Sequence, residues 1–242
     1  MVICEKKEKH IQAGEDRTQI GSQYTHIALD PETRLEIAHV VGKRNQETMD
    51  ELLRLTLERS TYPSNKDLCG WTLRLYQLLD WLGLYDGQKI LYLSDGDDRV
   101  TKGLEEIYAA IDYLYAQVIK HRQGNRVAWV ERVVIHGWEK EVLEMIAHCD
   151  HSQTINTAFI ERYNLTQRHL GTKSSRKKLS FAKKLPMLKY QEDITGVYYN
   201  FVRPHMTLSE QHGCEVTPAL QARITDHVWT WEEVLAYDLA FN

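Results

Sequence analysis

Residues 90–93, Ile-Leu-Tyr-Leu, constrain the fold of this chain more than any other segment. They form a continuous apolar run that ends at Ser94-Asp95-Gly96. A short run without polar alternation is typical of a strand buried inside a parallel sheet, with helices over both of its faces. The sequence therefore predicts an α/β fold with a central strand that ends at Asp95.

The segments around this strand supply the rest of an α/β pattern. Residues 24–29 and 35–41 read as strands, and the turn Asp30-Pro31-Glu32-Thr33 joins them into a hairpin. Asn45 is a good N-cap for a helix with an apolar stripe at 49–57. We also expect a helix near 104–110, a strand near 113–119, and helices over 155–170 and about 180–201, with an insertion-like segment at 61–87. Residues 120–153 are polar and favour no element. The order predicts a mixed sheet flanked by helices.

The chain opens on an apolar run, residues 1–4, that passes directly into Glu5-Lys6-Lys7-Glu8-Lys9. This pattern resembles the second half of a strand. We therefore expect the first strand of the sheet to be incomplete.

The helix expected over 155–170 has two different faces. At 3.6 residues per turn, one face carries the apolar residues Ile155, Phe159, Tyr163 and Leu170, and the opposite face carries the polar residues Glu161, Asn164 and Arg168. A carboxylate beside cations suits the binding of a divalent cation or of a polyanion. The alternative is an ordinary surface helix with a charged face.

Positive charge is concentrated in one region. The formal net charge of the 242 residues is −4, but residues 159–205 carry ten Lys and Arg against three Asp and Glu. A localised basic strip is the expected footprint of binding to a phosphate backbone, and a solvated basic helix is the alternative.

Chain length, cysteine spacing and the lack of long apolar runs together indicate a globular protein with one main core, without a disulfide framework and without a membrane span. A chain of 242 residues can bury one substantial core. Cys4, Cys69, Cys149 and Cys214 show no paired spacing, which fits a reducing cytoplasm. No apolar run reaches transmembrane length and no signal-peptide pattern is present, so we expect no membrane. His148, Cys149 and His151 suggest a zinc site, but no second ligand pair follows at finger-like spacing.

Asp95 and Glu161 are the candidate chemical groups. Phosphodiester cleavage and transfer use divalent ions held by carboxylates, and Mg²⁺ prefers oxygen ligands. Asp95 lies at a strand end, where α/β sheets place their chemistry, although Asp-Gly is also a common turn dipeptide. The aromatic residues Tyr190, Tyr198, Tyr199 and Phe201 serve as core or as a base-stacking surface, and we favour core.

Several segments together resemble the catalytic domain of insertion-sequence transposases of the DDE type. They are Ala28-Leu29-Asp30 with Val40-Val41-Gly42-Lys43-Arg44, Ser94-Asp95-Gly96, Ile160-Glu161-Arg162-Tyr163-Asn164-Leu165, Leu179-Ser180-Phe181-Ala182-Lys183, Tyr199-Asn200-Phe201-Val202-Arg203-Pro204-His205, Thr217-Pro218-Ala219 and Thr225-Asp226-His227-Val228-Trp229. They cover nearly the whole chain in the family's order.

The resemblance implies a ribonuclease H-like mixed sheet over residues 1–205 and a C-terminal tail over 206–242. It implies Asp95 and Glu161 as catalytic residues and ligands of Mg²⁺, or of Mn²⁺. The candidate DNA contacts are Arg162, Asn164, Arg168, Lys173, Arg176, Lys177 and Lys178. Arg203 and His205 either support the active site or are structural, and His205 is a candidate cap at the end of the preceding helix. The implied setting is DNA transposition by a mobile element, with transposon ends and target DNA as partners, a homo-oligomer, and the nucleoid of a bacterial cytoplasm.

One departure from the family bears on activity. Its first catalytic aspartate precedes a lysine run, which here is Lys6-Lys7-Glu8-Lys9, so the matching position falls before Met1. Glu5 replaces that ligand only if the strand shifts its register. The family's N-terminal DNA-binding segment is also absent from this sequence. We expect little or no transposition activity from this polypeptide alone.

Two other functions stay open at this point. The chain is a catalytically inactive DNA-binding remnant, or an inhibitor of a full-length transposase. Alternatively, it is an α/β phosphotransfer or hydrolase domain that uses Asp95, although no glycine-rich phosphate loop or nucleophile elbow supports this.

Overall fold

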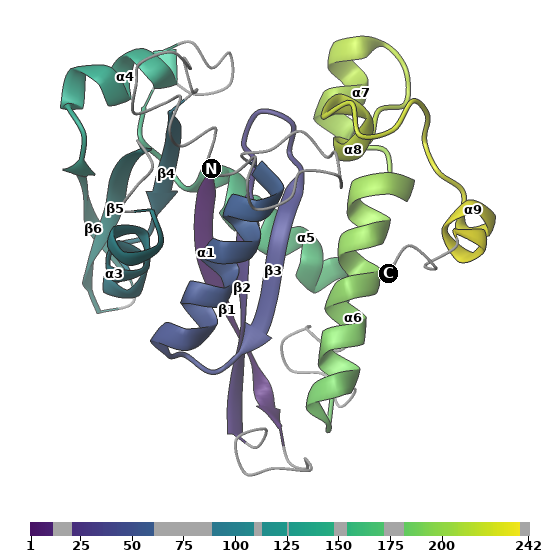
Figure 1. Ribbon diagram of the computed structural model, residues 1–242, viewed down its shortest axis with the longest axis horizontal. Helices are drawn as coiled ribbons and strands as arrows, with labels where there is room; N and C mark the ends of the chain where they lie inside the picture. Colours follow the sequence, from purple (N-terminus) through teal and green to yellow (C-terminus); the bar gives the residue numbers. More distant parts are fainter. Residues whose placement is uncertain are drawn as a thin grey trace, which may run out of the picture.

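The computed structural model describes residues 1–11, 21–60, 89–108, 113–124, 126–147, 154–171 and 182–237. Its centre is a six-stranded mixed sheet in the order β3-β2-β1-β4-β5-β6 (Figure 1). The strands are β1 (Val2–Ile11), β2 (Gly21–Leu29), β3 (Glu36–Gly42), β4 (Ile90–Ser94), β5 (Tyr113–Gln123) and β6 (Arg126–His136). β4 is parallel to β1 and β5, and the other neighbouring strands are antiparallel.

Helices cover both faces of the sheet. They are α1 (Gln46–Ser60), α3 (Asp98–Ile107), α4 (Glu139–Ala147), α5 (Ala158–Leu170), α6 (Leu185–Val197), the π-helical segment η2 (Tyr198–Val202), α7 (Met206–His212), α8 (Pro218–Gln221) and α9 (Trp231–Ala236). One face of the sheet packs on α1 and α3, and the other packs on α4 and α5. The predicted α/β class, with a mixed sheet flanked by helices, is confirmed.

The predicted central strand is β4, and both of its faces are buried. Leu91 and Leu93 join the core under α5, whereas Tyr92 joins the core under α1 and α3. The Tyr92 hydroxyl donates to the Tyr108 hydroxyl at 2.7 Å, and that hydroxyl donates to the Leu53 carbonyl at 3.2 Å. A chain of hydrogen bonds therefore joins the strand to both helices.

The predicted hairpin is also confirmed, as β2 and β3. Asp30 stabilises the turn, because its carboxylate accepts from the backbone amides of Glu32 and Thr33 at 3.2 and 3.1 Å. Arg34 completes the turn with φ of 66°, in the left-handed region that residues other than glycine rarely adopt.

β1 lies inside the sheet and is ten residues long. It pairs with β2 over most of this length, but its parallel ladder with β4 is short and its last pair is Ile3 with Ser94. The next positions on the two strands are Cys4 and Asp95. The register therefore brings Cys4 beside the end of β4.

The first half of α3 differs from the prediction. α3 begins at Asp98 and not near 104, because Asp97 caps it by accepting from the Arg99 amide at 3.0 Å.

The buried stripe of α5 is Ile160, Tyr163 and Gln167. Of the predicted stripe, Ile155, just before the helix, and Tyr163 are buried in the same core, and Phe159 packs partly buried against it. The prediction missed Ile160 and Gln167.

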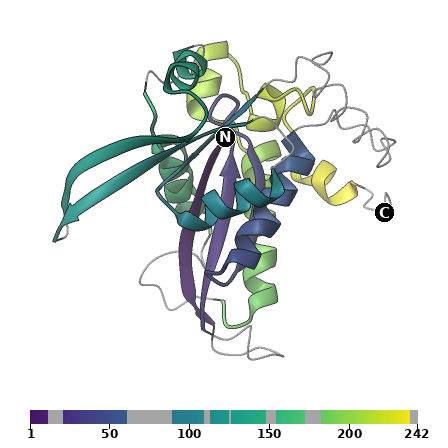
Figure 2. The same cartoon turned by 60° about the vertical axis from the view of Figure 1, so that its left-hand side comes forward.

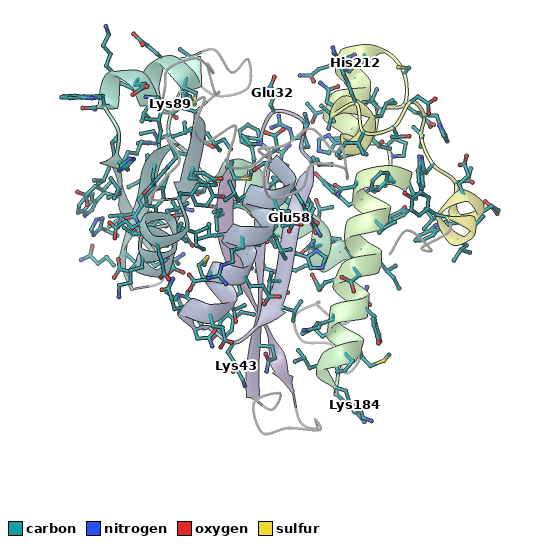
Figure 3. The ribbon with its side chains drawn as sticks, viewed as in Figure 1. Glu32, Lys43, Glu58, Lys89, Lys184 and His212 are labelled. Atoms are coloured by element: carbon teal, nitrogen blue, oxygen red, sulfur yellow. The ribbon has the colours of Figure 1, made fainter. Side chains whose placement is uncertain are left out.

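Residues 120–153, which favoured no element, contribute most of the β5–β6 hairpin and α4. Lys89, labelled in Figure 3, donates to Glu141 Oε1 at 2.7 Å and so ties the start of β4 to α4. The insertion-like segment 61–87 lies outside the described residues.

Asn200 of η2 joins the helical layer to β3 through the two bonds of a side-chain amide. Its Oδ1 accepts from the Glu36 amide at 3.0 Å, and its Nδ2 donates to the Glu36 carbonyl at 2.9 Å. The Glu36 carboxylate is buried and accepts from Gln167 at 3.3 Å, and it lies 2.5 Å from His39 Nδ1. This buried network fixes α5, η2 and β3 relative to one another.

Candidate nucleic-acid and metal site

An open cleft of about 670 Å³ lies between α5, the start of β1 and the ends of β4 and β5. Its charged side chains come from β4, β5 and α5, and they include both predicted carboxylates. They are Asp95, Glu161, Lys120, Arg122 and Arg168. We refer to this hollow as the carboxylate cleft.

Asp95 reaches the carboxylate cleft because the chain turns sharply after β4. Gly96 has φ of 80°, and a Cβ added there would lie 3.2 Å from Ile119 Cγ1 on β5. Both conditions favour glycine at this position. The turn leaves Asp95 exposed at the carboxyl end of a buried strand, as predicted.

Glu161 reaches the carboxylate cleft from the first turn of α5. Its Oε1 accepts from Lys120 Nζ in a salt bridge and from Thr157 Oγ1 at 2.8 Å. Partial burial acts to raise the pKa of Glu161, but the hydrogen bonds and charge of Lys120 outweigh it, and the pKa lies below its ordinary value. The carboxylate is therefore ionised at neutral pH.

Cys4, near the start of β1, is the third group beside the end of β4. Its side chain is 7% exposed, lines the carboxylate cleft and accepts a hydrogen bond from Asn164 Nδ2 at 2.9 Å. Within the part of the chain that the structure describes, Asn164 Oδ1 is buried without a hydrogen-bond partner. The carboxylate cleft thus places a thiol and an amide beside its two carboxylates.

β5 and β6 continue away from the carboxylate cleft as a two-stranded arm (Figure 2). The arm carries the cations Lys120, Arg122, Arg126 and Arg132 against the single acid Glu131. Trp129 is 54% exposed and stacks on His121 with ring centroids 3.6 Å apart. Basic side chains with an exposed aromatic ring are the features of a surface that binds nucleic acid.

The other predicted site residues fall into three groups. Asn164 and Arg168 line the carboxylate cleft, whereas Arg162 lies on the other side of α5 with Arg203 and His205. Lys173, Arg176, Lys177 and Lys178 lie outside the described residues, as do His148, Cys149 and His151. His205 is the N-cap of α7, so the expectation that it caps the end of the preceding helix was wrong.

Three contributors to the site were missed from the sequence. Lys120 and Arg122 fell in a segment with no expected element, although their spacing of two is that of one face of a strand. Cys4 could be placed in the site only from the register between β1 and β4, which brings it beside the end of β4.

No family model, curated protein or solved structure matches this chain. Among the described residues, no group of three or more His, Cys, Asp and Glu side chains is placed to hold a metal ion. No helix in the described part of the chain has the length and apolar character needed to cross a membrane.

Proposed function

We propose that this chain is a DDE-type transposase domain with a ribonuclease H-like fold, and that its carboxylate cleft receives DNA. The observation that carries the proposal is that Asp95 and Glu161, from distant parts of the sequence, line one cleft with three cations. Carboxylates of this kind hold the divalent ions used in phosphodiester chemistry, and cations hold the phosphate backbone. The basic arm with Trp129 extends the same surface.

The side chains of the carboxylate cleft fit a magnesium ion in part. Asp95 and Glu161 offer the hard oxygen ligands that Mg²⁺ and Mn²⁺ prefer, and such ions are commonly held by one or two carboxylates plus substrate phosphates. Cys4 offers a soft sulfur where a third carboxylate would complete the set. The proposed DNA cleavage and strand transfer are therefore impaired in this chain.

The residues of the carboxylate cleft have separate roles in this proposal. When bound, the metal ion would supply charge neutralisation at the phosphate and an activated water or hydroxyl. Glu161 can take a ligand role through Oε2 while Oε1 stays bonded to Lys120, or through both oxygens once Lys120 moves away. Lys120 is then placed to hold a phosphate oxygen, together with Arg122 and Arg168.

The test compares the intact chain with Cys4→Asp, Asp95→Asn and the double variant. We expect binding to a DNA duplex that weakens with salt, and background-level nicking of a supercoiled plasmid in Mg²⁺ or Mn²⁺. Cys4→Asp should raise metal-dependent nicking, and Asp95→Asn should abolish that gain. Thermal melts provide a second readout, since a buried carboxylate at position 4 should destabilise the fold without metal and less so with it.

The second candidate is a DNA-binding remnant without catalysis, or an inhibitor of a complete transposase. The salt bridge between Lys120 and Glu161 favours it, because it occupies the carboxylate with a cation of the chain itself. Metal-independent DNA binding, with no gain in Cys4→Asp, would select this candidate. A chain that fails to bind duplex DNA at low salt would contradict both.

The setting of this activity is also a proposal. We propose a bacterial cytoplasm, at the nucleoid, where the free thiols of Cys4 and Cys214 stay reduced. A homo-oligomer stays a prediction, which light scattering of the purified chain, with and without DNA, would check.

A further inference from the structure

A second hollow lies on the opposite side of α5 from the carboxylate cleft. It consists of two adjoining spaces of about 290 and 180 Å³. The two share Arg162, Thr166, Tyr199, His205 and Thr207 in their walls. We refer to this hollow as the arginine pocket. None of the described residues that line it is acidic.

Three arginines reach the arginine pocket from three parts of the chain. Arg34 comes from the turn after β2, Arg162 from α5 and Arg203 from the residue after η2. Within the described residues, neither Arg162 nor Arg203 forms an ion pair with a carboxylate. The nearby acid Glu36 is not a lining residue of the pocket, and its carboxylate is engaged by His39 and Gln167. The charges of Arg162 and Arg203 are therefore not balanced by acidic side chains in the walls of the pocket.

Arg34 is held rigidly for a side chain of this length. It is 7% exposed, its guanidinium carbon lies 4.0 Å above the centre of the Phe159 ring, and it donates to the Pro31 carbonyl. Its backbone has φ of 66°. Residues held in sparsely populated backbone conformations cluster at ligand sites.

His205 adds a neutral donor to the arginine pocket. Its Nδ1 accepts from the Leu208 amide at 3.5 Å, so the ring proton lies on Nε2. Burial, together with the charges of the three arginines, lowers the pKa of His205 to about 4. The ring is neutral at pH 7, and its Nε2–H is a donor for an anion.

We propose that the arginine pocket is a binding site for a phosphate group. A guanidinium presents a planar fork of donors that matches two oxygens of a phosphate, and Arg162 and Arg203 can approach one group from two sides. The buried Arg34 supplies a fixed charge behind them. The site is separate from the carboxylate cleft and does not depend on the chemistry proposed there. Its ligand is either a backbone phosphate of nucleic acid or free phosphate.

The test is calorimetric titration of the intact chain with inorganic phosphate at low ionic strength. Arg203→Gln and Arg162→Gln should each weaken phosphate binding roughly tenfold to a hundredfold, because each removes charge-assisted hydrogen bonds. Arg54→Gln, an exposed arginine on α1, is the matched control and should bind as the unaltered chain does. Circular dichroism melts of each variant separate loss of binding from loss of fold.

Competition against a DNA duplex distinguishes the two sources of phosphate. If inorganic phosphate displaces the duplex and Arg203→Gln weakens both ligands, the pocket holds a backbone phosphate. If phosphate binds without displacing the duplex, and Arg203→Gln weakens only phosphate, the pocket takes a free anion. Absence of phosphate binding at millimolar concentration, or equal binding by Arg203→Gln and Arg54→Gln, would overturn the proposal. The proposed catalysis fails or holds separately, because plasmid nicking is measured in Mg²⁺ or Mn²⁺ and phosphate binding is measured without metal.

Discussion

The carboxylate cleft and the arginine pocket lie on two sides of one helix and are built in opposite ways. Glu161 and Arg162 are neighbours in sequence, yet they line different hollows, because successive residues of a helix point about 100° apart. In the carboxylate cleft, acids and bases face each other and pair, as Lys120 and Glu161 do. In the arginine pocket, three cations converge without an acidic wall residue.

The supports of the two hollows differ as well. The carboxylate cleft is formed at the ends of strands, where turns and exposed side chains set its shape. The wall of the arginine pocket rests on the buried network of Glu36, Gln167 and Asn200. One α-helix thus separates a mixed-charge surface from a purely cationic one. Because the supports differ, we expect mutations on the two sides to change the free energy of unfolding by different amounts.

The largest expected effect compares Asn200, in the network that supports the arginine pocket, with Asn164, which lines the carboxylate cleft. Asn200→Ala should lower the free energy of unfolding by about 2–4 kcal/mol, because it leaves the buried amide and carbonyl of Glu36 without partners. Asn164→Ala should change it by less than about 1 kcal/mol, since it removes a weak bond to sulfur and a buried acceptor that lacks a partner. Denaturant unfolding of both variants measures the difference. Equal losses would show that the two hollows are supported alike.

A smaller effect comes from the protonation of His205. Its pKa in the folded chain, about 4, lies below the ordinary value of 6.5, so the unfolded chain binds the proton first as pH falls. The folded state should therefore lose stability as pH falls from about 6.5 towards 4. Because the ring is only partly buried, we expect a loss of about 1 kcal/mol between pH 7 and 5.

His205→Asn is the matched control for this titration. Asparagine can still cap α7 but does not titrate in this range. The difference in unfolding free energy between the unaltered chain and His205→Asn should be larger at pH 7 than at pH 5. Parallel curves would mean that His205 is as easily protonated in the folded chain as in water.

The smallest effect concerns the ion pair of the carboxylate cleft. Lys120→Met should raise the pKa of Glu161, because it removes the main hydrogen bond and charge that lower it. The stability that the pair contributes is present above the ordinary pKa of a glutamate and is lost as pH falls through the lowered one. This contribution should be below about 1 kcal/mol, since Glu161 is half exposed. Carboxyl NMR titration of Glu161 checks whether its pKa rises in the variant. An unchanged pKa would show that Lys120 does not lower it.

The sequence predicted the parts of this molecule that depend on local pattern. Residue types and spacing predicted the apolar run of β4 and the turn at Asp30. They also predicted the polar face of Glu161, Asn164 and Arg168. The burial of Gln167 on α5 could not be predicted, because its side chain is polar and depends on hydrogen bonds to Tyr163 and to the distant Glu36.

Two further features depend on contacts between distant segments. Cys4 joins the carboxylate cleft through strand register, and Arg34 joins the arginine pocket through a turn that folds back towards α5. Neither position carries a local motif. The strand expected near 113–119 is the first part of β5. The end of β5 and the whole of β6 were missed for another reason, since the exposed arm lacks the apolar alternation that marks a half-buried strand.

The hydrogen bonds between Asn200 and Glu36 also affect how readily the sheet associates with other chains in a concentrated solution. β3 is an outer strand of the sheet, and an outer strand offers unpaired amides and carbonyls to any other extended chain. The Asn200 side chain occupies one such amide and carbonyl as a neighbouring strand would, and Arg59 Nη1 donates to the Ile37 carbonyl at 2.8 Å. The helical layer thereby shields this border of the sheet from self-association and from the growth of aggregates.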